Sequence, residues 1–335
     1  IFPLDATMFD DRNCTGVVLF MKNVYLPVTY GIILVVGLLG NLTSISIYLM
    51  KLRPWKSSSI IMVNLAVTDL LYVLSMPFLI YYYSTWEIWE LGDFMCRFVR
   101  FSFHFHLYGS ILFLTCFAVF RYVVVIKPLL AARVQESIWG ITACAVVWLI
   151  AAAEIGPMLG MISLQEEKNQ TRCLDFASTI PVDVVRWYSW LLAVLGFLLP
   201  LVVVYMCYIS VVKQLAKGPN TKSPSRIRAR RVTMLILVVF VLCFMPYHIL
   251  RVLRIEARKM EMSPCMDNIV HAAYIFSRPL AGLNTFFNLA LYTLSGDKFR
   301  VAFLNIVCRE RWQRKNRSLM HVDIISKMGS GAPAS

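Results

Sequence analysis

Residues 187–212 read WYSWLLAVLGFLLPLVVVYMCYISVV and contain no aspartate, glutamate, lysine or arginine. An α-helix needs about 20 mostly apolar residues to cross the hydrocarbon core of a membrane. A transmembrane β-strand is about 10 residues long and alternates between apolar and polar side chains, which this stretch does not do. The sequence therefore predicts a membrane-spanning α-helix over these residues.

Six further stretches have the same character, and none of them contains more than two charged residues. They cover residues 24–50, 57–86, 98–126, 137–164, 232–250 and 268–296. Of the 335 residues in the chain, 59% are hydrophobic and 16% are charged, whereas about 25% of the residues in soluble domains are charged. We therefore expect an all-α membrane protein with seven transmembrane helices, rather than a soluble enzyme or a disordered chain.

The distribution of basic residues predicts which way the bundle faces. The first, third and fifth loops and the C-terminal tail together hold 20 lysines and arginines but four acidic residues. The opposite segments hold eight basic residues, with Arg251 and Arg254 assigned to the sixth helix, and 13 acidic residues. Cytoplasmic loops are enriched in lysine and arginine, so the N-terminus is expected outside the cell and the C-terminus inside. The net charge of +14 thus indicates a membrane surface, and not nucleic acid, as the partner.

Four segments follow from this topology. Residues 1–23 form an extracellular tail, and residues 24–295 form the seven-helix bundle. Residues 296–308 carry apolar side chains at helical spacing, so we expect a short amphipathic helix on the inner membrane face. Cys308 at its end is a candidate for palmitoylation. Residues 309–335 are polar and are expected to form a disordered cytoplasmic tail.

Cysteines and glycosylation sequons agree with this orientation. Four of the nine cysteines fall outside, where an oxidising compartment favours two disulfides, and three pairings are open for Cys14, Cys96, Cys173 and Cys265. Asn13 and Asn169 begin N-glycosylation sequons in the outer segments.

Asp69 is the one acidic residue in the second predicted helix. Ionisable groups within membrane spans are costly and usually functional. With Ser110, Asn284 and Asn288 as neutral partners, the carboxylate suits a small cation such as Na⁺; the alternative is a structural hydrogen-bond hub. The sequence shows no nucleophile–base pair, metal-ligand cluster or glycine-rich phosphate loop, so we expect neither catalysis nor another cofactor.

A series of short motifs across roughly residues 24–308 resembles the rhodopsin-like (class A) G-protein-coupled receptors. The motif residues are Gly40, Asn41, Leu65, Ala66, Asp69, Trp89, Gly92, Cys96, Phe120, Arg121, Tyr122, Trp148, Pro200, Tyr208, Cys243, Phe244, Pro246, Asn288 and Tyr292. The resemblance implies a plasma-membrane receptor whose partners are a heterotrimeric G protein, membrane lipid and, as a further candidate, arrestin. It also implies the disulfides Cys96–Cys173 and Cys14–Cys265.

The same resemblance implies which residues couple to the G protein and switch between states: Arg121, Tyr122, Tyr208, Phe244, Asn288 and Tyr292. Three positions depart from the family pattern. Phe120 replaces the acid that usually precedes the helix-three arginine, Phe244 stands where many members carry tryptophan, and Leu289 replaces the proline after Asn288. These departures concern the activation switch and not the fold.

Arg100, His104 and Tyr108 are spaced at i, i+4 and i+8, which places them on one face of the third helix. Together with residues 277–284, this stretch resembles the nucleotide-receptor-like group, and most of all its dicarboxylate branch. If the bundle closes as in the family, they converge on one outward cavity with Tyr30, Tyr83, His248, Arg251, Arg254, Tyr274 and Arg278. Arginine binds carboxylate or phosphate through two parallel hydrogen bonds, so this cavity is expected to bind an anion.

The preferred ligand is a small extracellular dicarboxylate such as 2-oxoglutarate. One carboxylate would be held by Arg100 and His104, and the other by Arg278 and Arg251. The alternatives are succinate, a nucleotide di- or triphosphate, or a cysteinyl leukotriene; an anion transporter is the alternative of another class. For Arg251 and Arg254, the competing interpretation is outward snorkelling or pairing with Glu256, Glu261 or Asp175.

Overall fold

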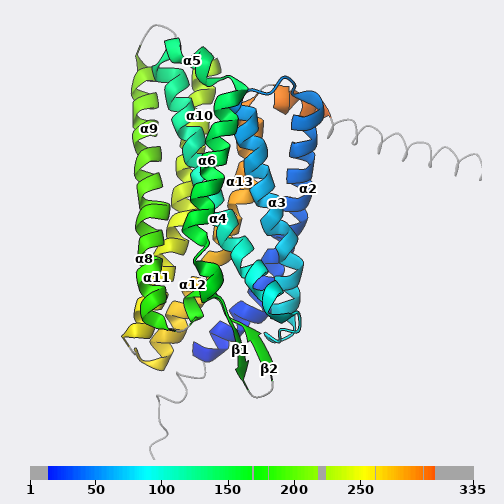
Figure 1. Ribbon diagram of the computed structural model, residues 1–335, viewed down its shortest axis with the longest axis vertical. Helices are drawn as coiled ribbons and strands as arrows, with labels where there is room; N and C mark the ends of the chain where they lie inside the picture. The colour runs from blue at the N-terminus through cyan, green and yellow to red at the C-terminus, as the bar shows by residue number, and fades with distance from the viewer. Residues whose placement is uncertain are drawn as a thin grey trace, which may run out of the picture.

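The computed structural model describes residues 14–167, 170–179, 181–217, 224–260, 262–296 and 298–305. Its long helices lie side by side along one axis (Figure 1). A small β-hairpin lies at one end of the bundle, and the short helix α5 (Pro128–Val134) lies at the other. We call these the hairpin end and the basic end; the charge pattern predicts that the hairpin end faces outside the cell.

Within the described residues, six helical segments are long and apolar enough to cross a membrane, and each coincides with a predicted stretch. In chain order they are Cys14–Lys51 with α2 (Leu26–Lys51), α3 (Ser57–Ser84), α4 (Gly92–Ile126), Ser137–Met161 with α6 (Ser137–Ile155) and α7 (Met158–Met161), Val182–Ala216 with α8 (Val182–Ala193) and α9 (Leu199–Ala216), and Arg226–Lys259 with α10 (Pro224–Val239) and α11 (Met245–Lys259).

The first helix extends further toward the N-terminus than the predicted start at Val24. It already includes Cys14 and passes through a π-helical turn, η1 (Met21–Tyr25), before α2. Val18 on this extension is buried, and Lys22 forms an ion pair with Glu87 at 3.0 Å. These contacts with the loop after α3 keep the additional turns helical.

Like η1, which precedes Pro27 in the first span, the π-helical turns in two further spans precede a proline. Turn η3 (Val194–Leu198) joins α8 to α9, and η4 (Phe240–Phe244) joins α10 to α11. Pro200 and Pro246 are each the second residue of the helix that follows. Proline has no backbone N–H and leaves a carbonyl of the preceding turn without its usual donor, which accounts for the local widening.

The seventh predicted stretch is helical but interrupted at Leu283. It forms α12 (Pro264–Gly282) and α13 (Asn284–Ser295), which together are long enough to span a membrane. Pro279 donates no backbone hydrogen bond, and the N–H of Leu283 is shared between the carbonyls of Pro279 and Leu280. At Gly282 a Cβ atom would lie 2.8 Å from the hydroxyl of Tyr72, so α3 packs closely against the interruption.

The hairpin consists of β1 (Leu164–Glu167) and β2 (Gln170–Cys173), paired antiparallel with Leu164 opposite Cys173. It leads into a short 3₁₀ turn, η2 (Phe176–Ser178). The structure contains the disulfides Cys96–Cys173 and Cys14–Cys265, the two pairs that the resemblance implied. Cys96 lies in α4, so the first disulfide fixes the end of the hairpin over the helix that carries Arg100.

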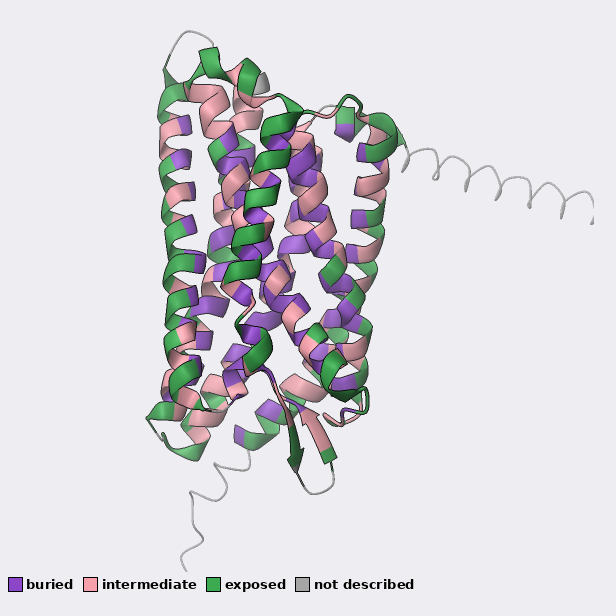
Figure 2. Ribbon diagram, in the orientation of Figure 1, coloured by how far each residue is buried: buried purple, intermediate pink, exposed green. Residues whose placement is uncertain are grey.

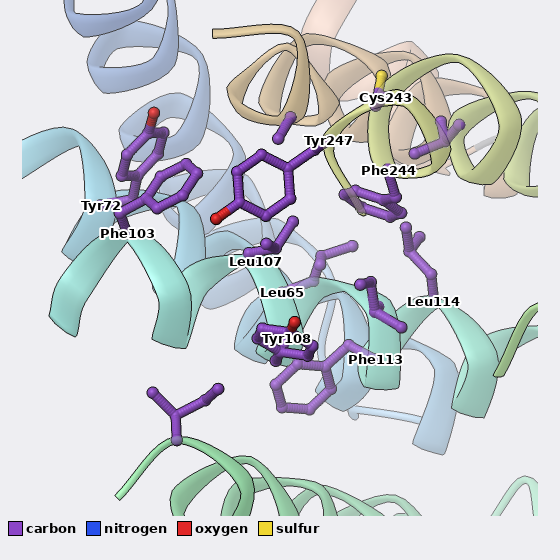
Figure 3. Packing of buried hydrophobic residues seen from close by; sticks show 14 of the residues in the cluster. Leu65, Tyr72, Phe103, Leu107, Tyr108, Phe113, Leu114, Cys243, Phe244 and Tyr247 are labelled. Atoms are coloured by element: carbon purple, nitrogen blue, oxygen red, sulfur yellow. The ribbon is translucent and has the colours of Figure 1, made fainter. Parts of the chain in front are cut away.

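Burial divides the helices into two faces. Residues that face the centre of the bundle are mostly buried, whereas the outward faces are exposed (Figure 2). Large apolar side chains such as Leu39, Leu74 and Leu149 are on the exposed faces, as a surrounding of lipid requires. Aromatic rings fill the centre: Figure 3 shows Tyr72 beside Phe103, with ring centroids 5.6 Å apart.

At the basic end, residues 298–305 are helical. Phe299 is buried there, with its ring centroid 5.1 Å from that of Tyr48 in α2. The amphipathic eighth helix over residues 296–308 stays a prediction, because residues 306–308 lie outside the described part of the chain. Cys308, Asn13, Asn169 and Glu261 also lie outside it.

Candidate ligand-binding site

Arg100 of α4 and Arg278 of α12 come together near the hairpin end of the bundle. Both donate hydrogen bonds from Nη1 to the hydroxyl of Tyr83 in α3, at 3.1 and 2.9 Å. Arg100 also donates from Nη2 to the carbonyl of Cys173 at 2.7 Å. Both side chains are almost fully buried. Three helices and the hairpin thus place two guanidinium groups around one tyrosine hydroxyl.

Asp175, from the loop after β2, lies opposite this arginine pair. Its Oδ1 is 3.9 Å from Nη1 of Arg100 and 3.8 Å from Nη2 of Arg278, too far for a hydrogen bond. Its Oδ2 accepts a hydrogen bond from the Tyr274 hydroxyl at 2.5 Å. Burial raises the pKa of the Asp175 carboxyl, but the guanidiniums of Arg278 and Arg100 outweigh burial and hold the pKa well below its ordinary value.

The second cationic group is Arg251 of α11. It is fully buried, and its Nη1 donates to the Tyr108 hydroxyl at 2.7 Å while its Nη2 donates to the carbonyl of Ser189 at 3.3 Å. Nε2 of His248 lies 3.2 Å from the same Tyr108 hydroxyl. Among the described residues, no carboxylate lies within ion-pair distance of Arg251, so its charge is compensated by dipoles alone.

The orientation of His248 follows from its partners. Nδ1 lies 2.8 Å from the carbonyl oxygen of Phe244, which can only accept, so Nδ1 carries the proton. With the imidazole neutral, Nε2 then accepts from the hydroxyl of Tyr108, which itself accepts from Arg251. A directed chain of hydrogen bonds therefore runs from Arg251 through Tyr108 and His248 to the backbone at Phe244.

His104 and Tyr247 lie between the arginine pair and Arg251. The Tyr247 hydroxyl is 3.1 Å from Nε2 of His104, whose Nδ1 is 2.9 Å from the carbonyl of Arg100. The guanidinium of Arg251 lies over the Tyr247 ring, 5.4 Å from its centroid. His104 thus orients Tyr247 rather than contacting either arginine side chain directly.

A cavity of about 80 Å³ opens at the arginine pair, and four of the ten predicted ligand residues line it. The lining residues are Lys22, Tyr82, Tyr83, Glu87, Arg100, Arg172, Cys173, Leu174, Asp175, Ser178, His271, Tyr274, Ile275 and Arg278. The cavity lining does not include His104, Tyr108, His248, Arg251 and Tyr30, all of which are buried. The structure therefore brings the predicted residues into two neighbouring groups instead of one open cavity.

Two predicted ligand residues have other positions. Arg254 forms an ion pair with Asp267 of α12 and lines a separate surface depression. Glu256, one of its considered partners, pairs instead with Arg186 at 2.7 Å. The ring of Tyr30 is 6.4 Å from that of Tyr83, and its buried hydroxyl has no hydrogen-bond partner in the described part of the chain.

The predicted switch residues lie toward the basic end. Arg121 donates to the carbonyl of Ser295 at 3.1 Å and lies over the ring of Phe117. It forms no ion pair among the described residues, in keeping with phenylalanine at position 120. Tyr292 is buried, with its ring 6.1 Å from Tyr48; Phe244 is buried against Phe240. Tyr122 and Tyr208 are partly exposed on the halves of α4 and α9 nearer the basic end.

Asp69 of α3 forms the centre of another buried polar cluster. Asn288 donates to both of its carboxylate oxygens, at 3.2 and 3.0 Å, and Thr285 donates to Oδ1 at 3.4 Å. Nδ1 of His106 is also 3.4 Å from Oδ1. His106, which the sequence interpretation passed over, lies between Asp69 and the predicted partners Ser110 and Asn284.

Membrane-length helices, a polar cavity at one end and a disulfide-anchored hairpin over it define a multi-pass membrane receptor. Residues 40–292 match the family model described as 7 transmembrane receptor (rhodopsin family), and the chain belongs to this family. Members of the family are receptors and not enzymes.

Three relatives illustrate the similarity. The chain is 50% identical to 2-oxoglutarate receptor 1 of Mus musculus over 316 residues, which cover 92% of this chain and 94% of that protein. It is 50% identical to 2-oxoglutarate receptor 1 of Rattus norvegicus over 296 residues, 88% of each chain. It is 37% identical to purinoceptor 4 of Homo sapiens over 283 residues, covering 83% of this chain and 77% of that protein.

Proposed function

We propose that this chain is a G-protein-coupled receptor activated by 2-oxoglutarate from the extracellular side. The observation that carries the proposal is the charge balance of the site. Arg100, Arg278 and Arg251 are buried, and among the described residues Asp175, shared by Arg100 and Arg278, is the one carboxylate within ion-pair distance of any of them. Buried charges are costly unless they are paired, so two positive charges remain for a ligand with two carboxylates.

The presence of two cationic groups, with His104 and Tyr247 between them, supports a ligand with an anion at each end. One carboxylate would bind Arg100 and Arg278 beside Asp175, and the other would approach Arg251. The Tyr83 hydroxyl accepts from both arginines and keeps its own proton to donate to a carboxylate or keto oxygen, whereas the hydroxyl protons of Tyr108 and Tyr247 point to His248 and His104. The sequence predicted that Arg278 and Arg251 bind the same carboxylate. In the structure-based proposal, Arg278 binds one carboxylate together with Arg100, and Arg251 binds the other.

Succinate carries the same two charges and is the first alternative. A nucleotide is supported by the similarity to purinoceptors, but that similarity is lower, and a cavity of about 80 Å³ suits a small anion better. A cysteinyl leukotriene would need a long apolar extension of the cavity. Membership of the receptor family counts against the anion transporter.

Ligand binding would act by shifting an existing equilibrium between two conformations. An anion at Arg251 competes with Tyr108 for its guanidinium and so alters the hydrogen-bond chain that ends at Phe244. Phe244 belongs to the π-helical turn in the sixth span, where helix geometry is already irregular. We infer that this turn transmits binding to the basic end.

The remaining parts of the proposal concern topology and partners. The hairpin end faces outside the plasma membrane, and the basic end faces the cytoplasm. There a G protein binds at Arg121, Tyr208 and Tyr292, with arrestin as a further candidate partner and membrane lipid around the apolar belt. The proposal requires no cofactor; sodium at Asp69 stays a prediction, and the position of His106 counts against it.

The test is a panel of 2-oxoglutarate, succinate, ADP and a cysteinyl leukotriene on cells that express the chain, with calcium and cyclic-nucleotide readouts. We expect 2-oxoglutarate to be the most potent of the four. Untransfected cells and the Arg278→Ala variant are the controls. Equal or higher potency of ADP would replace the dicarboxylate by the nucleotide alternative, and radiolabelled uptake without signalling would indicate a transporter.

A further inference from the structure

The cluster around Asp69 lies in the middle of the bundle, apart from the arginine groups and from Arg121. It connects three spans: Asp69 belongs to α3, His106 and Ser110 to α4, and Asn284 to the start of α13. All four residues are fully buried. From the sequence, Asp69 and its neutral partners Ser110, Asn284 and Asn288 are predicted to form a sodium site. The hydrogen bonds around Asp69 show whether these oxygens are free to bind an ion.

The imidazole of His106 is inserted among these oxygens. Its Nε2 is 3.1 Å from Oδ1 of Asn284, and its Nδ1 is 3.4 Å from Oδ1 of Asp69 and 3.5 Å from Oγ of Ser110. An amide oxygen only accepts, so Nε2 donates to Asn284. The predicted partners Ser110 and Asn284 therefore meet His106, and no direct hydrogen bond from either to Asp69 occurs among the described residues.

The carboxylate of Asp69 is satisfied mainly by donors. The Asn288 amide N–H₂ group and the Thr285 hydroxyl donate to it. Hard cations require several oxygen lone pairs that converge on one point. Here a ring nitrogen from α4 lies 3.4 Å from Asp69 Oδ1, and the Asn284 oxygen already accepts from a ring N–H. Of the two asparagines, only Asn288 leaves its oxygen without a partner among the described residues, which is too few for a hard cation. The residues present thus do not fit a sodium ion.

The ring of His106 is held in this position from both sides. It stacks on Tyr72 with a centroid distance of 4.5 Å and an interplanar angle of 9°. The hydroxyl of Tyr72 in turn lies against Gly282, directly before the interruption at Leu283. His106 is therefore connected to the interruption of the seventh span through Asn284 on one side and through Tyr72 on the other.

We propose that the imidazole of His106 takes the place of a sodium ion between α3, α4 and α13, and that this receptor functions without sodium. The ring stacks on Tyr72 of α3 and donates to Asn284 of α13, so it joins the same elements that an ion would join, and it belongs to the chain itself. The proposal is independent of the ligand assigned above, because it concerns a different set of residues and is measured without agonist.

The experiment compares purified receptor in sodium chloride and in choline chloride at equal ionic strength and fixed pH. The first readout is the midpoint of thermal unfolding without agonist, and the second is ligand-independent G-protein activation. For the parent chain we expect no difference between the two salts. In His106→Asn, the smaller amide opens space and supplies an oxygen, so sodium should raise the unfolding midpoint and lower ligand-independent activation by about fivefold, the lower end of usual allosteric couplings.

Two further variants make the result decisive. Asp69→Asn in the His106→Asn background should abolish the acquired sodium effect, because it removes the carboxylate. His106→Gln serves if the asparagine variant does not reach the membrane, since glutamine also supplies an amide oxygen. A sodium effect in the parent chain as large as in His106→Asn would overturn the proposal, as would sodium insensitivity of both His106 variants when they are folded.

Discussion

At the scale of single residues, the buried arginines of the site have few hydrogen-bond acceptors, and this leaves them able to bind a ligand anion. Arg100 and Arg278 use one tyrosine hydroxyl between them, and Arg251 relies on a second tyrosine and a backbone carbonyl. Nε of each of these arginines is buried without a hydrogen-bond partner in the described residues. Buried N–H groups without acceptors bind a ligand carboxylate strongly, because each carboxylate can accept several of their hydrogen bonds.

The first prediction concerns these donors. Arg100→Ala and Arg278→Ala should each raise the EC50 for 2-oxoglutarate at least tenfold, because a charge-assisted hydrogen bond contributes about 1.5–3 kcal/mol and about 1.4 kcal/mol is a factor of ten. Lysine should restore part of the loss, since it keeps the charge but not the two-pronged geometry. Arg254→Ala is the matched control, because Arg254 pairs with Asp267 away from the cavity.

The readout is a dose–response curve at matched surface expression. Normal potency in both Arg100→Ala and Arg278→Ala would show that the anion binds elsewhere. A loss in Arg254→Ala as large as that in Arg278→Ala would show that the effect is not specific to the cavity.

The second prediction concerns Asp175, which competes with a ligand carboxylate for the same two guanidiniums. Asp175→Asn keeps the shape and removes the charge, so the EC50 for 2-oxoglutarate should fall by about tenfold, the equivalent of about 1.4 kcal/mol. A neutral amide that left potency unchanged or reduced it would mean that Asp175 helps to bind the ligand instead of opposing it.

The depressed pKa of Asp175 sets the pH dependence of this effect. A carboxyl whose pKa is lowered in the folded state loses its charge only when the pH falls through that lowered value. Between about pH 5 and pH 8 the charge therefore stays constant, and the ratio of parent to Asp175→Asn potency should be flat over this range. Potency ratios measured at several pH values check this; a ratio that approaches one on acidification would contradict it.

At the scale of elements, periodicity predicted which residues share a helix face but not which partners they meet. Arg100, His104 and Tyr108 do lie along one face of α4, as the spacing indicated. Their partners come from α3, from the end of the hairpin and from α11. The Cys96–Cys173 disulfide fixes the end of the hairpin, and the π-helical turn η4 precedes α11. A π turn shifts every later residue around the helix axis, and hydropathy carries no signal for it.

His106 shows the same limit. A lone histidine in an apolar helix is typical of a packing residue, and its neighbours Asn284 and Tyr72 come from spans far away in the sequence. The one available signal was its spacing of four residues from Ser110, which places both side chains on the face toward Asp69. The direction of Asn284 depends on the interruption of the helix at Leu283, which the sequence did not predict. The spacing alone therefore could not show whether His106 binds an ion or occupies the place of one.

The third prediction concerns the end of α4 that lies at the basic end of the bundle. Arg121 has no ion-pair partner among the described residues and is held by the Ser295 carbonyl and the Phe117 ring. Phe120→Asp supplies a neighbouring carboxylate and should lower ligand-independent signalling by about twofold to fivefold, because exposed ion pairs contribute up to about 1 kcal/mol. Phe120→Asn, equal in size but uncharged, is the control; an equal decrease in both variants would assign the effect to lost packing.

At the scale of the whole molecule, the hydropathy pattern predicted the spans because lipid imposes a requirement that does not depend on tertiary contacts. Any helix that crosses the membrane must be long and apolar on its outward face. Hydropathy does not predict how the bundle closes, because closure requires contact between the first and last spans. The Cys14–Cys265 disulfide joins them across 251 residues, and Cys265 is the second residue of α12, the helix that carries Tyr274 and Arg278.

The last prediction tests this closure. Loss of a disulfide between distant residues costs about 2–4 kcal/mol, largely because the unfolded chain gains freedom. Cys14→Ser, Cys265→Ser and the double variant should therefore lower the midpoint of thermal unfolding by the same amount, and 2-oxoglutarate should become less potent as α12 loses its attachment. Cys116→Ser, at a free cysteine inside the bundle, controls for the substitution itself. A double variant markedly less stable than either single one would show that the two cysteines act separately, and closure of the bundle would then rest on helix packing alone.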